Sequence, residues 1–225
     1  MSSINSHFTF IYSQPSEYRL SHDSVFFARQ IFEQMKTIEL SGTKALDICA
    51  GAGVVGMDFL FHRRTAGESV PLDFDFVDVQ NVYEEHFAVN ALRLGSIGTR
   101  LKFLCFNYNE LLAEEYKNAY SLIVCNPPYF LPDLGKLSPS VFKNRCKFFI
   151  DSDLNKLMCA LFNCLKPDGV CFMMLKDLPQ HGLQILAEVR DFSKNKLLIE
   201  NLGHIRGTSF LRITALKPVE VKEIK

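Results

Sequence analysis

An Asn-Pro-Pro-Tyr tetrapeptide, Asn126, Pro127, Pro128 and Tyr129, is the segment of this chain best suited to chemistry on an amine. Proline fixes φ and has no N–H, so the loop should be stiff and its carbonyl groups exposed. The Asn126 side-chain carbonyl and the Pro127 backbone carbonyl can accept both hydrogens of a planar –NH2 group. That arrangement orients the nitrogen lone pair for attack without a strong base. Tyr129 offers an aromatic face on which a base can stack. We therefore predict that this loop is catalytic.

A glycine-rich loop precedes this tetrapeptide in the chain, between an apolar run and a helical pattern. Glycine lets the backbone turn sharply and approach a ligand closely. In α/β folds, nucleotides bind at this place, outside the carboxyl ends of the strands. A tight turn without a ligand also favours glycine. The residues that we predict to contact a cofactor here are Asp47, Cys49, Ala50, Gly51, Ala52 and Gly53.

An acidic residue, Asp78, ends the apolar run that follows the glycine loop and its helix. A carboxylate in that position can accept hydrogen bonds from both ribose hydroxyls of an adenosine. A solvated carboxylate at a strand end is the alternative, and the nearby Asp73 and Asp75 favour that alternative. A nicotinamide dinucleotide and S-adenosylmethionine would both use such a residue, so Asp78 does not separate the two cofactors.

The spacing of apolar residues indicates an α/β fold in which these loops lie at strand ends. Apolar runs alternate with helical patterns, which is typical of βαβ units and a mostly parallel sheet with helices on both faces. The predicted strands span 44–49, 72–79, 101–106, 122–125 and 170–175, followed by a hairpin of 196–200 and 209–216. The predicted helices span 24–36, 54–64, 82–94, 153–165 and 183–190. We expect residues 166–169, Lys-Pro-Asp-Gly, to form a turn before the fifth strand.

Composition is that of an ordinary globular domain. The chain has 225 residues, of which 48% are hydrophobic and 22% charged, and its formal net charge is zero. The chain therefore has no overall electrostatic field that would attract it to a polyanion such as a nucleic acid. The beginning lacks a signal-peptide pattern, no apolar segment is long enough to span a bilayer, and no two of the seven cysteines form a C-x-x-C pair. We expect one domain (residues 1–40 as an N-terminal segment and helix, 41–225 as the catalytic core), cytoplasmic, with neither metal nor membrane contact.

Residues 47–53, Asp78 and residues 126–129 together resemble the class I S-adenosylmethionine-dependent methyltransferases that modify exocyclic amines of adenine or the side-chain amide of glutamine. Residues 14–24 are similar to the beginning of the bacterial tRNA adenine-N6 methyltransferases that act on the anticodon loop of a valine tRNA. The resemblance implies a Rossmann-like sheet of seven mostly parallel strands with a C-terminal antiparallel hairpin. It also implies S-adenosyl-L-methionine as cofactor and a nucleic acid, tRNA, as partner.

Three positions depart from the family's pattern. Cys49 stands where the first glycine of the loop usually lies, and Asp78 stands where Glu is more common. Asn107 replaces an Asp that binds the adenine amino group in the family. An Asn carbonyl can still accept that hydrogen bond, but it contributes no charge. The resemblance also places Val79, Asn107 and Asn126 in the cofactor site.

Basic residues after the catalytic loop are candidates for contact with RNA phosphates. No acidic residue lies between Asp133 and Asp151, a stretch that contains Lys136, Lys143, Arg145 and Lys147. Of these we predict RNA contact for Lys143, Arg145 and Lys147, and three later residues could extend the surface: Arg206, Arg212 and Lys217. Solvated side chains are the alternative.

The motifs predict methyl transfer to an exocyclic amine, with adenine N6 in tRNA as the expected acceptor. Methylation of a glutamine amide in a protein such as a release factor uses the same loop. Those enzymes usually carry a separate helical amino-terminal domain, whereas only about 40 residues precede the first predicted strand. A catalytically silent domain that binds the cofactor or RNA is a further alternative, which Asn107 keeps open. A nicotinamide-dependent dehydrogenase would not explain residues 126–129. The modified nucleotide and the oligomeric state stay open.

Overall fold

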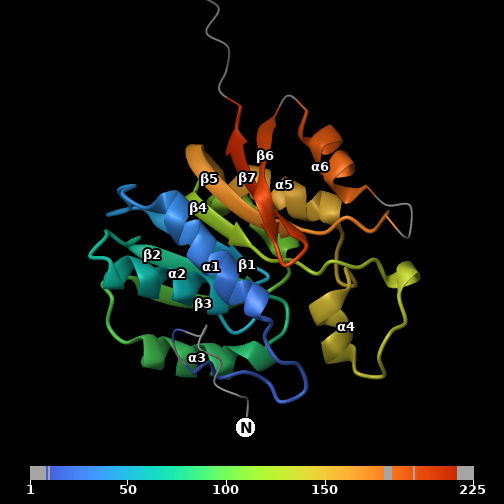
Figure 1. Ribbon diagram of the computed structural model, residues 1–225, viewed down its shortest axis with the longest axis horizontal. Coiled ribbons are helices and arrows are strands. Elements are labelled where there is room, and N and C mark those ends of the chain that lie inside the picture. Colours follow the sequence, from blue (N-terminus) through green and yellow to red (C-terminus); the bar gives the residue numbers. More distant parts are fainter. Residues whose placement is uncertain (1–8, 10, 180–183, 195, 217–225) are drawn as a thin grey trace, which may run out of the picture.

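Seven strands form one sheet in the order β3-β2-β1-β4-β5-β7-β6 (Figure 1). The computed structural model describes residues 9, 11–179, 184–194 and 196–216. The strands are β1 Lys44–Ile48, β2 Asp73–Asp78, β3 Arg100–Cys105, β4 Tyr120–Cys125, β5 Leu165–Leu175, β6 Leu197–Ile205 and β7 Thr208–Ala215. All pairings are parallel except those that β7 makes with β5 and β6. The predicted seven-stranded, mostly parallel sheet with a C-terminal antiparallel pair is therefore confirmed.

Helices cover both faces of the sheet (Figure 1). The covering helices are α1 His22–Met35, α2 Val54–Thr65, α3 Val82–Leu94, α5 Leu154–Cys164 and α6 Ile185–Ser193. The chain also forms α4 Val141–Lys147, which lies apart from the sheet, and short 3-10 helices η1 Tyr108–Leu112, η2 Glu114–Tyr116 and η3 Pro132–Leu134. Side chains alternate along each strand. Phe74, Phe76 and Val124 accordingly pack with α1, α2 and α3. Leu46 and Ile123 pack with α5 and α6 on the other face.

The predicted turn at residues 166–169 is wrong, because these residues belong to β5. Leu165 pairs with Tyr120 and Val170 pairs with Leu122, so residues 166–169 bulge out of the ladder. A Cβ on Gly169 would lie 3.0 Å from the Tyr120 carbonyl oxygen, so glycine lets the bulge close. Pro and Gly here produce a β-bulge within a paired strand rather than a separating loop. Helix α4 was not predicted, and the start of the predicted helix 183–190 lies outside the described residues.

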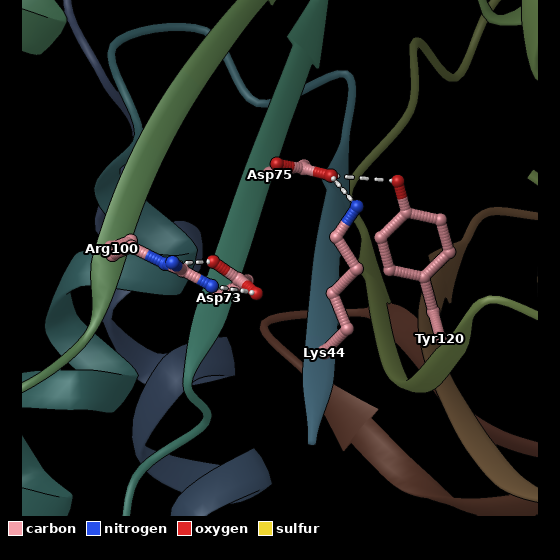
Figure 2. Close-up of polar contacts among 5 residues, drawn as sticks. All are labelled: Lys44, Asp73, Asp75, Arg100 and Tyr120. Atoms are coloured by element: carbon pink, nitrogen blue, oxygen red, sulfur yellow. Dashed lines mark hydrogen bonds and ion pairs between the residues drawn. The ribbon is translucent and has the colours of Figure 1, made fainter. Parts of the chain in front are cut away.

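Polar side chains join the first four strands near their amino ends (Figure 2). Arg100 donates two hydrogen bonds to the carboxylate of Asp73, at 2.6 and 2.9 Å. These bonds hold the pKa of Asp73 below its usual range. The buried Asp75 accepts from Lys44 Nζ and from the Tyr120 hydroxyl, each at 2.8 Å. Asp73 and Asp75 therefore join strands to one another, at the end of the sheet opposite Asp78.

The segment before α1 is fastened to α2 and α3 by buried polar groups. Asn90 of α3 accepts from Ser13 N at 2.6 Å and donates to the carbonyl oxygens of Ser13 and Ala52 at 3.0 and 2.9 Å. The Tyr12 hydroxyl donates to Asp58, which is buried on α2. These bonds satisfy groups that would otherwise be costly to bury. They also direct the residues after Ser13 toward the carboxyl ends of the strands.

Gly56, in the first turn of α2, lies against β2. A Cβ added there would be 2.5 Å from Phe76 Cε1 and 2.9 Å from Phe74 Cζ. Both rings are fully buried and close-packed, so they have little room to retreat. We expect Gly56→Ala to lower the free energy of unfolding by about 1–3 kcal/mol through overpacking. Urea denaturation followed by circular dichroism measures this change.

Thr65→Ala, at an exposed position of the same helix, serves as the control and should change stability by less than about 0.5 kcal/mol. Adding Phe76→Leu to Gly56→Ala removes the ring edge and should recover part of the stability. An unfolding midpoint of Gly56→Ala equal to that of the unmodified chain would contradict the close helix–strand packing.

Candidate active site

A cavity of about 320 Å³ opens at the carboxyl ends of β1, β2 and β4. β1 and β4 are neighbours, but the chain leaves them toward opposite edges of the sheet. Loops diverge at such a switch point and leave a crevice for a ligand. The volume lies within the range of small-molecule sites, about 300–1,000 Å³. Of the predicted site residues, the wall contains Cys49, Ala50, Gly51, Ala52, Asp78, Val79, Asn107, Asn126, Pro127, Pro128, Tyr129, Arg145 and Lys147.

Three predicted site residues, Asp47, Gly53 and Lys143, do not line the cavity. Asp47 is fully buried and accepts a hydrogen bond from Gly56 N at 3.0 Å, which fastens the first turn of α2 to β1. Gly53 is the N-cap of α2 with φ 79°, and a Cβ there would lie 2.9 Å from Phe87 Cδ2. Asp47 and Gly53 therefore shape the glycine loop from behind, whereas Lys143 lies on α4 outside the cavity wall.

The glycine loop turns through left-handed backbone. Cys49 and Gly51 have φ values of 60° and 53°. A residue with a side chain is destabilised by about 1–2 kcal/mol in this region, which explains why glycine is usual where Cys49 stands. Gly51 N–H donates to Asp78 Oδ2 at 2.8 Å, and Gln80 N–H donates to Asp78 Oδ1 at 2.9 Å. Asp78 therefore ties the glycine loop to the end of β2.

Asp78 is a carboxylate in the cavity wall with acceptor capacity left over. Burial raises its pKa to about 6, although the backbone N–H groups of Gln80 and Gly51 act in the opposite direction. An ionised carboxylate offers about four lone-pair positions. The two backbone donors leave room for hydroxyl donors from a ligand. Asp78 therefore differs from Asp73 and Asp75, which pair with side chains of neighbouring strands.

The Asn-Pro-Pro-Tyr loop directly follows β4 and forms part of the cavity wall. The Tyr129 hydroxyl donates to Asn126 Oδ1 at 2.5 Å, and Asn126 Nδ2 donates to Ser24 Oγ at 3.3 Å. Tyr129 is half-buried, and burial raises the pKa of its hydroxyl. Tyr129 thus fixes the Asn126 amide in one orientation. A carbonyl oxygen has two lone pairs, so Asn126 can still accept a hydrogen bond from an amine.

Asn107 spans two loops at the end of β3. Its Oδ1 accepts from Asn109 N at 2.9 Å, and its Nδ2 donates to the Asp151 backbone carbonyl at 3.0 Å. Both ends of the amide therefore have protein partners, although the residue lines the cavity.

Sequence reasoning missed α4 and underused the segment before α1, which together close the cavity on one side. The segment contributes Gln14, Tyr18 and Ser21 to the wall, the first turn of α1 contributes Asp23 and Ser24, and α4 contributes Cys146. The Ser140 hydroxyl donates to Glu17 Oε2 at 3.0 Å, and Lys147 Nζ lies 5.8 Å from the centre of the Tyr18 ring. Ser140, whose side chain caps α4, was the one local signal for this helix.

Several basic residues predicted to contact RNA are paired with acids of the protein. Arg145 Nη2 lies 2.8 Å from Asp151 Oδ1, and Arg206 Nε lies 3.3 Å from Asp23 Oδ1. Arg212 donates two hydrogen bonds to Glu200, at 2.7 and 3.0 Å. Lys217 lies outside the described residues. The basic surface near the cavity thus rests on Lys136, Lys143 and Lys147, of which the first and last are exposed.

In the part of the chain that the structure describes, no group of three or more His, Cys, Asp and Glu side chains is placed to hold a metal ion. All seven cysteines are free thiols. No helix among the described residues has the length and apolar character needed to cross a membrane.

Two curated relatives are similar to this chain, and no family model matches it. One is the tRNA1(Val) (adenine(37)-N6)-methyltransferase of Shewanella sp. strain W3-18-1, 25% identical over 142 residues, which are 63% of this chain and 56% of that protein. The enzyme of the same name from Shewanella putrefaciens is 24% identical over 146 residues. The chain thus spans little more than half the length of the curated relatives it matches. The predicted resemblance is confirmed at this level of identity.

Solved structures show the same fold. A ribosomal protein L11 methylase from Lactobacillus delbrueckii subsp. bulgaricus matches with a TM-score of 0.57 at 16% identity, over 88% of this chain and 81% of that one. A Listeria monocytogenes protein assigned to the class I S-adenosylmethionine-dependent methyltransferases matches with a TM-score of 0.61 at 16% identity, over 93% of this chain and 64% of that one. The chain therefore has the class I methyltransferase fold.

Asp47 should make stability depend on pH. Burial raises its pKa to about 8, and its Oδ1 has no hydrogen-bond partner among the described residues. In the unfolded chain an Asp ionises near pH 3.9, at about its ordinary value. Between these two values the folded state keeps a proton that the unfolded state releases, so the free energy of unfolding falls as pH rises. Asp47→Asn, neutral at every pH, should flatten this decline.

Urea denaturation at about pH 6.5 and 8.5 measures this decline, and the Asp78 pKa of about 6 lies below that range. Burial also raises the pKa of Cys125, Cys164 and Cys171, so only the part of the decline that Asp47→Asn removes belongs to Asp47. Asp168→Asn changes an exposed carboxylate and should keep the decline of the unmodified chain. Equal declines in Asp47→Asn and the unmodified chain would show that Asp47 is ionised in the folded state.

Proposed function

We propose that this chain is an S-adenosylmethionine-dependent N-methyltransferase that methylates the N6 amino group of adenine in RNA, with tRNA as the substrate. The observation that carries this proposal is that one cavity is lined by the glycine loop, by Asp78 and by residues 126–129. The first two suit an adenosine-containing cofactor, and the third suits a planar amine. The names of the two curated relatives support the same reaction.

The residues at the ends of β1 and β2 fit S-adenosylmethionine. Gly51, with φ 53°, leaves the backbone open to close approach by a ligand, and Asp78 has lone pairs for two ribose hydroxyls. When bound, the cofactor would supply an electrophilic methyl group on a sulfonium sulfur. Asn126 follows β4, next to β1 in the sheet, so the acceptor loop and the cofactor loop are adjacent. Adjacent loops can hold the amine and the methyl group in line.

Asn126 and Pro127 would orient the acceptor. Their carbonyl oxygens accept the two hydrogens of the amino group, which turns the nitrogen lone pair toward the methyl group. Positive charge develops on the nitrogen as the new bond forms, and the two carbonyl dipoles stabilise that charge. The Tyr129 hydroxyl, bonded to Asn126 Oδ1 at 2.5 Å, prevents rotation of the amide. Neither Asn126 nor Pro127 has to remove a proton from the amine before the attack.

Aromatic and basic residues at the acceptor side support a nucleic-acid base rather than a glutamine side chain. Tyr18, Tyr129 and Phe130 all line the cavity. Flat side chains of this kind can stack on a base splayed out of an RNA strand. Lys147 also lines the cavity, and its exposed ammonium group suits a phosphate beside that base. A glutamine acceptor would need neither feature.

Asn126→Ala should lower the single-turnover rate of methyl transfer to tRNA by about 100-fold or more, because it removes a preorganised acceptor of the target amine. Affinity for S-adenosylhomocysteine should change far less, since the loop faces the acceptor. Asn155→Ala, at an exposed position on α5, is the matched control. Tyr129→Phe keeps the aromatic face but releases the Asn126 amide, so it should lower the rate less than Asn126→Ala does. Tyr129→Ala should also weaken acceptor binding.

The assay uses labelled S-adenosylmethionine with separate pools of tRNA, rRNA, DNA and protein. Labelling of tRNA alone supports the proposal, and labelling of the protein pool alone would favour a glutamine acceptor. A wild-type rate for Asn126→Ala would exclude this loop as the active site. A chain that binds the cofactor but labels no pool would be a silent binding domain.

Lys143 and Lys147 should bind RNA phosphates. Replacing both by Ala should weaken tRNA binding and reduce the log–log dependence of affinity on salt by about 0.7–0.9 for each phosphate that is no longer neutralised. Fluorescence anisotropy at several salt concentrations measures the slope. The control replaces Lys102 and Lys166, two lysines of β3 and β5, and should leave the slope unchanged. A slope unaltered by the first pair would mean that Lys143 and Lys147 are only solvated.

A further inference from the structure

Asp151 is a carboxylate that the sequence did not single out, and it lies in the wall of the cavity. It belongs to the connection between α4 and α5, yet it reaches the end of β3. Asn107 Nδ2 donates to its backbone carbonyl at 3.0 Å, which holds the Asp151 backbone against the loop after β3. Its side chain is only 22% exposed. Asp151 therefore has a fixed place beside Asn107.

The order of the strands indicates which part of a bound cofactor would lie near Asp151. The acceptor loop follows β4, and the ribose-binding candidate Asp78 ends β2. The sheet runs β3-β2-β1-β4 across this edge. A cofactor with its methyl group near Asn126 and its ribose at Asp78 extends its base toward β3. The polar side chains at that end of the cavity include Asn107 and Asp151.

Asn107 offers the base a weaker acceptor, because its neutral Oδ1 already accepts Asn109 N–H at 2.9 Å and keeps only one lone pair. Asp151, by contrast, presents a carboxylate with about four lone-pair positions. Arg145 Nη2 lies 2.8 Å from Asp151 Oδ1, so the pair fixes the carboxylate and leaves acceptor positions for another donor. Asp151 is also among the groups that raise the pKa of Asp78, which agrees with both carboxylates facing one cavity.

We infer that Asp151 accepts a hydrogen bond from the 6-amino group of the cofactor's adenine, with Arg145 as the positioning residue for that carboxylate. The inference rests on the proposed function. It reassigns to Asp151 the hydrogen bond that the resemblance implied for Asn107. It also gives Arg145 a place in the cofactor site rather than on the RNA surface.

The test compares two ligands by calorimetry with the full chain. One is S-adenosylhomocysteine, and the other is its analogue with hydrogen in place of the 6-amino group. The unmodified chain should bind the first about 10- to 100-fold more tightly, as expected for a hydrogen bond to a charged group. Asp151→Ala should weaken binding of the first ligand only and bring the ratio close to one. Arg145→Ala should reduce the ratio to an intermediate value.

Asp168→Ala, at an exposed carboxylate of β5, should keep the ratio of the unmodified chain. Asp151→Asn provides a variant of the same shape if Asp151→Ala does not fold, and its ratio should also fall. A purely structural role for Asp151 would weaken both ligands equally and keep the ratio, which would overturn the inference. Equal binding of both ligands by the unmodified chain would overturn it as well and leave the proposed function standing. Binding of neither ligand would reject the proposed function itself.

Discussion

The parallel pairing of β1 with β4 is the constraint on which the candidate site depends. Ile48 lies beside Cys125 in this ladder, and the glycine loop and the Asn-Pro-Pro-Tyr loop begin directly after these two residues. The chain then turns to β2 and β3 on one side and to β5, β7 and β6 on the other. The two loops therefore diverge and leave a crevice between them. Shifting β4 to another place in the sheet would separate the amine-binding loop from the cofactor loop, even with every local turn preserved.

Aspartate side chains at the two ends of the sheet have different partners. On β2, Asp73 and Asp75 have cationic partners, Arg100 and Lys44, at 2.6 and 2.8 Å. Asp78, on the same strand, has backbone N–H partners and a pKa raised by burial. Ion pairs between strands suit the end that only has to hold the sheet together. A carboxylate that is desolvated and only partly satisfied suits the end that receives a ligand, because a donor from the ligand then gains more than it would in water.

Local patterns in the sequence predicted most of the strands, and they predicted that the glycine loop and Asn126 follow strand ends. They could do so because apolar runs mark where each buried strand ends. The same patterns could not tell Asp47 from Asp78. Both acids stand near strand ends, and only the packing of α2 over Asp47 decides which one is covered. Pro167 and Gly169 signal a break whether or not their strand stays paired, so the same signal predicts a turn where the structure has a bulge. Helix α4 has 7 residues, too few for a periodic signal. The pairing of Arg145 with Asp151 depends on tertiary structure that no local pattern encodes.

The place of β7 has a consequence for how the chain folds during synthesis. β7 is the last of the described strands to leave the ribosome, yet it lies between β5 and β6. Until residues 208–215 emerge, β5 presents an open edge and β6 has no neighbour to pair with. The two-residue turn at Arg206 and Gly207, both with positive φ, then lets β7 fold back at once along β6. The nascent protein therefore carries an incomplete sheet, with an edge open to other chains, until almost all of its core has been translated.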